Sequence, residues 1–126
     1  MQTDRAGGLA IADGKPGLKI DIQPTDQATV VRLAGDVDLN VSSQLRARLK
    51  ELVREQRPRI VVDMAGVPYV DSSGVATLVE CLQGVSRYGG KLCLAALTTR
   101  TRSVFEISRL DTVFSIARTV EEALQA

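Results

Sequence analysis

The sequence predicts a single α/β domain: one mixed, mostly parallel sheet of about five strands with an antiparallel N-terminal edge, together with about four helices. Three observations predict this fold. The chain has 126 residues, the length of one domain. Segments of strand length alternate with segments whose apolar residues recur at helical spacing, as in the crossover units of a parallel sheet. Two strand-like segments come first with no helix between them, which indicates a hairpin.

The expected hairpin follows a polar N-terminal segment. Residues 1–17 contain four glycines and few large apolar side chains, so we expect a flexible tail there. Apolar and polar residues alternate over 18–24, as in a half-buried strand. A turn at 25–27 leads to a β-branched segment at 28–34, which predicts the second strand.

Two segments, 42–56 and 74–88, predict amphipathic helices because each carries one apolar stripe. We expect Asn40 or Ser42 to cap the first of them. Between them, residues 60–64 are apolar in succession, which is typical of a strand covered on both faces. The two stripes consist of Val41, Leu45, Leu49, Leu52 and Val53, and of Val75, Leu78, Val79, Leu82 and Val85.

The C-terminal part continues the alternation of strands and helices. A glycine pair at 89–90 ends the second helix. In the next helix we expect Val104 and Ile107 to face the core. The remaining elements are expected as a strand at 91–97, that helix at 98–109, a strand at 113–117 and a helical turn or two at 120–126.

The composition excludes several classes of function. Sixteen lysine and arginine residues and fifteen aspartate and glutamate residues give a net charge of +1, which argues against partners such as nucleic acid or an anionic membrane. The chain has no histidine, so catalysis, metal binding and phosphorelay through histidine are excluded within it. No apolar run approaches the ~20 residues of a membrane span. No secretory signal is visible, and we therefore expect a cytoplasmic protein.

No cysteine or glycine pattern in the sequence indicates a cofactor or a metal site. Cys81 and Cys93 are the only cysteines, too few for a zinc site of cysteines alone or for a disulfide scaffold, so we expect small core residues. The glycine pairs at 7–8 and 89–90 lack the spacing of a phosphate-binding loop.

The motif Asp71-Ser72-Ser73-Gly74 stands directly before the second apolar stripe. Asp71 is then the expected N-cap, and both serines lie in the first turn. One interpretation is only structural, because these residue types start helices well. The other is functional: free N–H groups and the helix dipole let a first-turn hydroxyl accept a phosphoryl group. Gly74 would leave a kinase room, and Asp71 would repel the added phosphate.

Asp36 and Asp38 end the second strand and leave two further interpretations open. Paired acids there can bind Mg²⁺ or accept a phosphoryl group, as in aspartate-based phosphatases. Such enzymes also need a lysine and more acids after later strands. Here Lys91 precedes its strand and Lys50 lies on the outer face of a helix, while Asp63 lies within a strand and can point either way. Otherwise the pair forms a polar turn in which Asp38 helps to present the serines. Neither serine has a catalytic base or a Gly-x-Ser-x-Gly or Ser-x-x-Lys context, so we do not expect an enzyme.

Taken together, these motifs resemble the STAS domain family, and more closely its bacterial anti-sigma factor antagonists. The likeness assigns residues 18–126 to the STAS domain. It is carried by the segments 33–38, 60–63 with 69–74, 89–92 and 104–114. Family members usually have leucine and glycine after the motif, where Val75 and Ala76 stand here.

The resemblance implies a partner switch. The dephosphorylated antagonist binds an anti-sigma factor, which is a serine kinase, and a sigma factor is released. The kinase phosphorylates a serine of the motif and ends the binding, and a metal-dependent serine phosphatase resets the switch. The family's acceptor serine maps to Ser73, with Ser72 as the alternative. Asp38, Asp71, Ser72 and Gly74 are the implied partner-binding residues.

Other uses of the same module remain open. A STAS domain can also serve as a subunit of a lipid transporter, as a stressosome scaffold or in a partner switch that controls something other than a sigma factor. An intact Asp71-Ser72-Ser73-Gly74 motif favours a module that is still phosphorylated. A small Mg²⁺-dependent phosphohydrolase built on Asp36 and Asp38 is the less favoured alternative.

Overall fold

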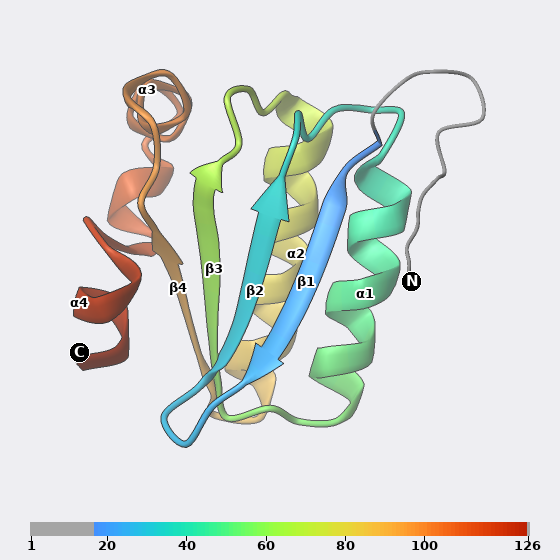
Figure 1. The fold of residues 1–126 in the computed structure, drawn as a ribbon, viewed down its shortest axis with the longest axis vertical. Coiled ribbons are helices and arrows are strands. Elements are labelled where there is room, and N and C mark those ends of the chain that lie inside the picture. Colours follow the sequence, from blue (N-terminus) through green and yellow to red (C-terminus); the bar gives the residue numbers. More distant parts are fainter. Residues whose placement is uncertain (1–16, 126) are drawn as a thin grey trace, which may run out of the picture.

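A computed structural model describes residues 17–125 of the chain and confirms the predicted sheet (Figure 1). Its five strands are hydrogen-bonded in sequence order; β1 is antiparallel to β2, and all other neighbours are parallel. The strands are β1 (Lys19–Pro24), β2 (Thr29–Ala34), β3 (Arg59–Gly66), β4 (Lys91–Ala95) and β5 (Ser115–Ala117). The flexible tail predicted at 1–17 lies, apart from Gly17, outside the described residues.

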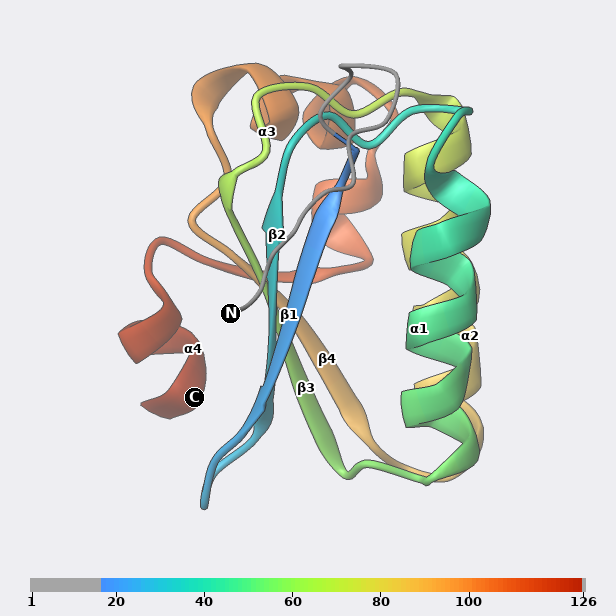
Figure 2. The same cartoon turned by 45° about the vertical axis from the view of Figure 1, so that its right-hand side comes forward.

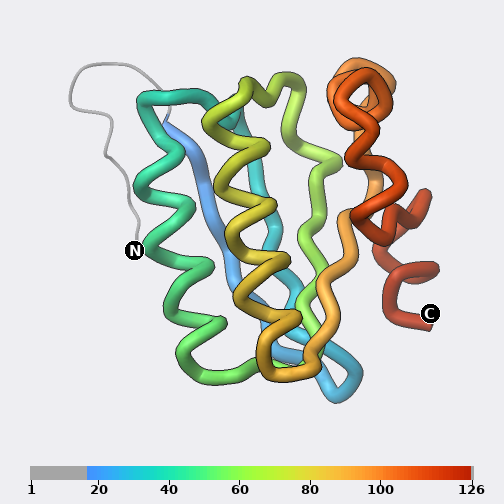
Figure 3. Tube along the Cα trace, turned by 180° about the vertical axis from the view of Figure 1, so that it is seen from behind, coloured from blue at the N-terminus to red at the C-terminus, as the bar shows by residue number. Residues whose placement is uncertain are grey.

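The helices are α1 (Ser42–Arg54), α2 (Ser72–Arg87), α3 (Thr99–Ile107) and α4 (Val120–Gln125), with a short 3₁₀ turn, η1, at Leu110–Thr112. Helices α1 and α2 lie side by side on one face of the sheet, and α4 lies on the other (Figures 2 and 3). The single apolar stripe predicted for each of these two helices packs into the core against the sheet. Within residues 17–125, no helix is long and apolar enough to cross a membrane.

Strand β3 is buried from both sides, as its run of apolar residues predicts. Ile60 and Val62 pack into the large core under α1 and α2, where Leu45 and Leu78 are also buried. Val61, one residue out of phase, packs into a second cluster that contains Ala123 of α4. Both clusters hold the central strand in place, and residues 67–70 connect β3 to the motif at residues 71–74.

The predicted cap of α1 is wrong. The N-cap position is Val41, and no side chain caps the helix there. The chain instead turns earlier: the Asp38 carbonyl oxygen accepts hydrogen bonds from the backbone N–H groups of Val41 (3.1 Å) and Ser42 (2.9 Å). The turn at Asp38 therefore already satisfies the Ser42 N–H, a donor that a cap at Asn40 would have satisfied.

The predicted inner face of α3 is also wrong at Ile107, which is 84% exposed. Thr101 and Phe105 are buried instead, and Val104 is half-buried. Phe105 meets the Phe114 ring edge to face, with 5.5 Å between ring centroids. Since successive helical residues are about 100° apart, burying Phe105 turns Ile107 toward solvent. An aromatic side chain buries more apolar area than isoleucine and sets the rotation of this short helix.

Some element ends differ from the prediction by about two residues. Strand β3 extends to Gly66, and β4 ends at Ala95. Strand β5 begins at Ser115 and not at Val113, because the Leu110 carbonyl of η1 accepts from the N–H groups of Val113 (3.0 Å) and Phe114 (2.9 Å).

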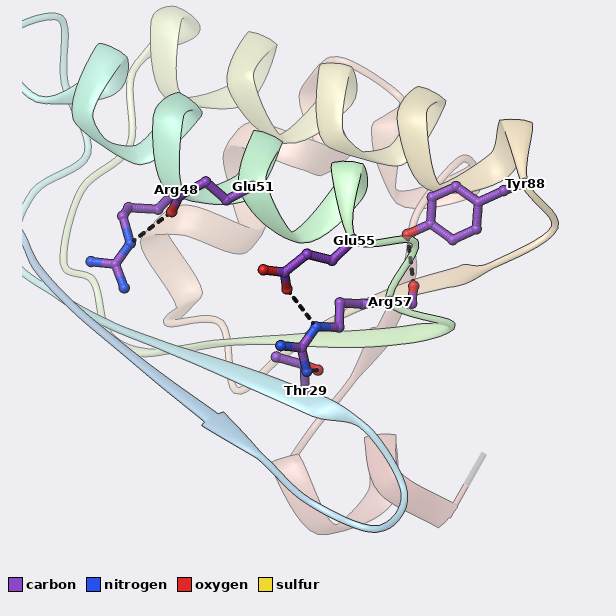
Figure 4. A network of polar contacts seen from close by, with 6 residues as sticks. All are labelled: Thr29, Arg48, Glu51, Glu55, Arg57 and Tyr88. Carbon is purple, nitrogen blue, oxygen red and sulfur yellow. Dashed lines mark hydrogen bonds and ion pairs between the residues drawn. The ribbon is translucent and has the colours of Figure 1, made fainter.

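A polar network fixes the end of the domain remote from the start of α2 (Figure 4). The Arg57 guanidinium donates to Glu55 Oε1 (2.8 Å) and to Thr29 Oγ1 (3.3 Å). The Tyr88 hydroxyl donates to the Arg57 carbonyl oxygen (2.6 Å). These contacts join the loop between α1 and β3 to β2 and to the C-terminal end of α2.

Candidate functional site

The segments that follow β2 and β3 meet at one edge of the sheet. Parallel strands place their carboxyl ends at the same edge, where ligand and partner sites of α/β proteins gather. Here a parallel bridge joins Val37 to Val70. The Val37 N–H donates to the Tyr69 carbonyl oxygen (2.9 Å), and the Asp71 N–H donates to the Val37 carbonyl oxygen (3.1 Å). The bridge holds the segment that contains Asp38 beside the motif that starts α2.

Asp71 is the N-cap of α2, as predicted. Its Oδ1 accepts from the N–H groups of Ser73 (2.9 Å) and Gly74 (3.1 Å), and from the Ser73 hydroxyl (2.6 Å). Its Oδ2 accepts from the N–H of Leu39 (3.1 Å), on the neighbouring segment. These donors, with the Ser73 hydroxyl as the largest contributor, hold the pKa of the Asp71 carboxyl below its ordinary value of 3.8. The carboxylate is therefore charged at neutral pH and joins two segments of the site.

The two serines of the motif differ in environment. Ser73 is half-buried, and its hydroxyl is bound to Asp71. Ser72 is exposed, and its hydroxyl forms no hydrogen bond with the described part of the chain. Exposure alone thus favours Ser72 as the phosphate acceptor, whereas only Ser73 has its hydroxyl in contact with a charged group.

Gly74 is buried, and its missing side chain leaves space for this chain's own core. A Cβ at this position would lie 2.7 Å from side-chain atoms of Val37 and Val70 and 2.8 Å from the Val37 carbonyl oxygen. Glycine therefore lets the first turn of α2 lie against the Val37–Val70 bridge. The space that we expected Gly74 to leave for a kinase is occupied by Val37 and Val70 of this chain.

Asp38 lies at the same edge but is turned toward its own loop. Its Oδ1 accepts from the Asn40 N–H (3.0 Å), and its carbonyl oxygen accepts from Ser42. The carboxylate thus stabilises the turn beside Ser73 without contacting that serine. Asp36 is exposed. Over residues 17–125 there is no group of three or more acidic, cysteine or histidine side chains that could hold a metal ion.

Sequence reasoning missed two apolar side chains at this edge. Leu39 is 75% exposed although it stands between Asp38 and the first turn of α1. Tyr69 is 36% exposed, and the Arg100 guanidinium lies 5.2 Å from the centre of its ring. The signal that could have revealed Leu39 is a large apolar residue inside a turn of polar ones.

The cysteines lie away from this site. Cys81 is buried in the large core, as expected, and burial raises the pKa of its thiol to about 12. Burial also raises the pKa of Cys93, which packs against the second cluster. Both thiols are therefore protonated at neutral pH and are poor nucleophiles.

The STAS domain model matches residues 19–123 of this α/β domain. The chain belongs to the STAS domain family. The anti-sigma-B factor antagonist of Bacillus subtilis is 28% identical over 108 residues, which cover 86% of this chain and 98% of that protein. An anti-sigma factor antagonist from Mycobacterium paratuberculosis has the same fold (TM-score 0.81, 22% identity, covering 86% of this chain and 92% of that one). So does the Bacillus cell fate determinant SpoIIAA in its phosphorylated form (TM-score 0.68, 24% identity, covering 85% and 97%).

Proposed function

We propose that this protein is a cytoplasmic anti-sigma factor antagonist with no enzymatic activity of its own. Unphosphorylated, it binds an anti-sigma factor that is a serine kinase, so that a sigma factor is released. Phosphorylation of Ser73 ends this binding, and a metal-dependent serine phosphatase restores it. The names of the relatives support the class of function. The observation that carries the proposal is the Ser73 hydroxyl in the first turn of α2, in contact with Asp71 at the open edge of the sheet.

The modification is a phosphoryl transfer from ATP. Ser73 Oγ forms a bond to the γ-phosphorus, the bond from that phosphorus to the bridging oxygen of ADP breaks, and ADP leaves. The hydroxyl proton passes to a base of the kinase. Before the transfer, Asp71 orients the hydroxyl by accepting a 2.6 Å hydrogen bond from it, which leaves the oxygen lone pairs free to point elsewhere.

The added charge accounts for the switch. A phosphoserine carries about −1.5 to −2 charges at pH 7, and here it would stand beside the carboxylate that now binds its hydroxyl. A helix N-terminus can accommodate a phosphate. A partner surface that covers the neutral hydroxyl would have to bury this charge without a counter-charge. Leaving a charge buried and unpaired in an interface costs about 2–5 kcal/mol of binding free energy. Loss of partner binding follows.

The assignment to Ser73 and not Ser72 is tested by mass spectrometry. The wild type, Ser73→Ala and Ser72→Ala are incubated with ATP and the anti-sigma factor kinase encoded in the same genome, and their peptides are mapped. We expect one phosphoryl group on the wild type and on Ser72→Ala, and none on Ser73→Ala. Phosphorylation of Ser73→Ala at Ser72 would move the acceptor by one residue. A wild type that no such kinase modifies would contradict the proposed function.

A further inference from the structure

Leu39 combines exposure with a fixed position beside the phosphorylation site. Its side chain is 75% exposed, and its backbone N–H is held by Asp71 Oδ2 at 3.1 Å. The rest of its turn is closed by contacts of Asp38 with Asn40 and Ser42. The bond to Asp71 is thus the side-chain contact that ties the Leu39 main chain to the motif carrying Ser73.

We infer that Leu39 is an apolar contact for the kinase partner and that Asp71 couples its position to the phosphorylation state of Ser73. This inference rests on the proposed function, since it takes the kinase as the partner. A kinase that reaches the Ser73 hydroxyl must cover this edge of the sheet, because the Val37–Val70 bridge holds the two segments together. The surface of the kinase that fits the exposed Leu39 side chain is an apolar pocket.

The coupling follows because the Ser73 hydroxyl and the Leu39 N–H both donate to the Asp71 carboxylate. Asp71 Oδ1 accepts the Ser73 hydroxyl proton, and Oδ2 accepts the Leu39 N–H. Phosphorylation replaces that hydroxyl proton by phosphorus, so Oδ1 loses a donor and faces phosphate oxygens instead. Two like charges at this separation repel each other. When the carboxylate turns away from the phosphate, the Leu39 N–H loses its acceptor and the turn loses its tie to α2.

The contact is tested with two leucine-sized apolar residues of similar exposure. Leu39→Ala and Ile107→Ala each shorten an exposed side chain, Ile107 being 84% exposed at the end of α3. Removing a buried apolar contact from an interface weakens binding about tenfold. We therefore expect the Kd for the kinase to rise about tenfold for Leu39→Ala and to stay unchanged for Ile107→Ala. If both variants bind the kinase with the same Kd as the wild type, Leu39 does not contact the kinase.

The coupling is tested without any kinase. Phosphoserine is incorporated at position 73 during translation, and amide hydrogen exchange is measured by NMR. We expect the Leu39 amide to exchange about tenfold faster than in the unmodified protein, because it loses a bond to a charged acceptor. The Asn40 amide, bound to Asp38, is the internal control and should keep its rate.

Asp71→Asn provides an independent version of the same test. Its single side-chain oxygen can still cap α2, but its NH₂ group would then face the Leu39 N–H, so the Leu39 amide should again exchange about tenfold faster. An unchanged Leu39 rate in the protein with phosphoserine at position 73 would overturn the coupling, and an unchanged rate in Asp71→Asn would show that the Asp71 bond does not protect this amide. Because no kinase takes part, this result is separate from the phosphorylation assay: a failure there contradicts the proposed function, whereas a failure here contradicts only the coupling.

Discussion

At the scale of single residues, the Asp71 carboxylate organises the site through hydrogen bonds from Ser73, Gly74 and Leu39. Because these bonds form only in the folded state, its pKa is lower in the folded than in the unfolded protein. A depressed carboxyl pKa stabilises the fold above the unfolded pKa, and this contribution is lost as the pH falls through the folded pKa. The Asp71 carboxylate therefore stabilises the folded state at neutral pH, and this stabilisation is lost only as the pH falls below the ordinary carboxyl pKa of 3.8.

Replacing Ser73 by alanine should raise the pKa of Asp71. The Ser73 hydroxyl is the largest cause of the lowered value, and the backbone donors remain in the variant. The measurement is an NMR titration of the Asp71 carboxyl carbon in Ser73→Ala and in the wild type. We expect the variant to stay folded and to titrate at a higher pH. The same midpoint in both proteins would show that the hydroxyl does not donate to Asp71 in solution.

Gly74 and Gly84 form a matched pair within α2. Alanine at position 74 would crowd the Val37 backbone and two valine side chains at 2.7–2.8 Å, whereas alanine at position 84 would lie 3.0 Å from one Val53 methyl group. Overpacking of this kind costs about 1–3 kcal/mol, and alanine in a helix regains about 1 kcal/mol over glycine. In urea unfolding, Gly74→Ala should be clearly less stable than Gly84→Ala. The reverse order would contradict the account of Gly74.

At the scale of elements, the rotation of α3 can be measured. Phe105 is fully buried and stacks edge to face on Phe114, while Ile107 is exposed. Phe105→Ala should cost about 3–5 kcal/mol of unfolding free energy because it leaves a cavity. Ile107→Ala should change stability by at most about 0.5 kcal/mol, as surface substitutions do. If chemical denaturation shows the larger loss for Ile107→Ala, the helix is rotated as the sequence pattern predicted.

The same helix shows why some elements can be predicted from sequence and others cannot. Helices α1 and α2 have apolar stripes over several turns, so their periodicity determines which face is buried. Helix α3 has nine residues and offers more than one candidate inner face. Its rotation depends on Phe114, which lies beyond its end and meets Phe105 only in the fold.

Some features of the site can likewise be predicted from local sequence, and others depend on contacts made only in the fold. Asp71 as the cap and the serines in the first turn follow from local sequence, because capping is a contact between near neighbours. The bond from Leu39 to Asp71 joins residues 32 positions apart, and the space at Gly74 is filled by Val37 from another segment. Local patterns do not encode such contacts. They require the parallel pairing of β2 with β3 to be known first.

At the scale of the whole molecule, the proposed switch would be a local change on a well-packed frame. Both sheet faces contribute to packed cores, and the Arg57 network fixes the end of the domain remote from Ser73. The net charge is +1, so no strong long-range field masks a change at one edge. A phosphate adds about −1.5 to −2 charges, which exceeds the net charge of the entire chain.

The most direct test of this account is the affinity of the kinase for the protein that carries phosphoserine at position 73. The unmodified protein and a protein with phosphoserine at position 72 are the matched controls, measured by calorimetry in the same buffer. We expect phosphoserine at position 73 to raise the Kd about a hundredfold, the effect of an uncompensated charge in an interface, and phosphoserine at position 72 to have a much smaller effect. If the kinase binds the protein phosphorylated at Ser73 as tightly as the unmodified one, Ser73 is not the switch.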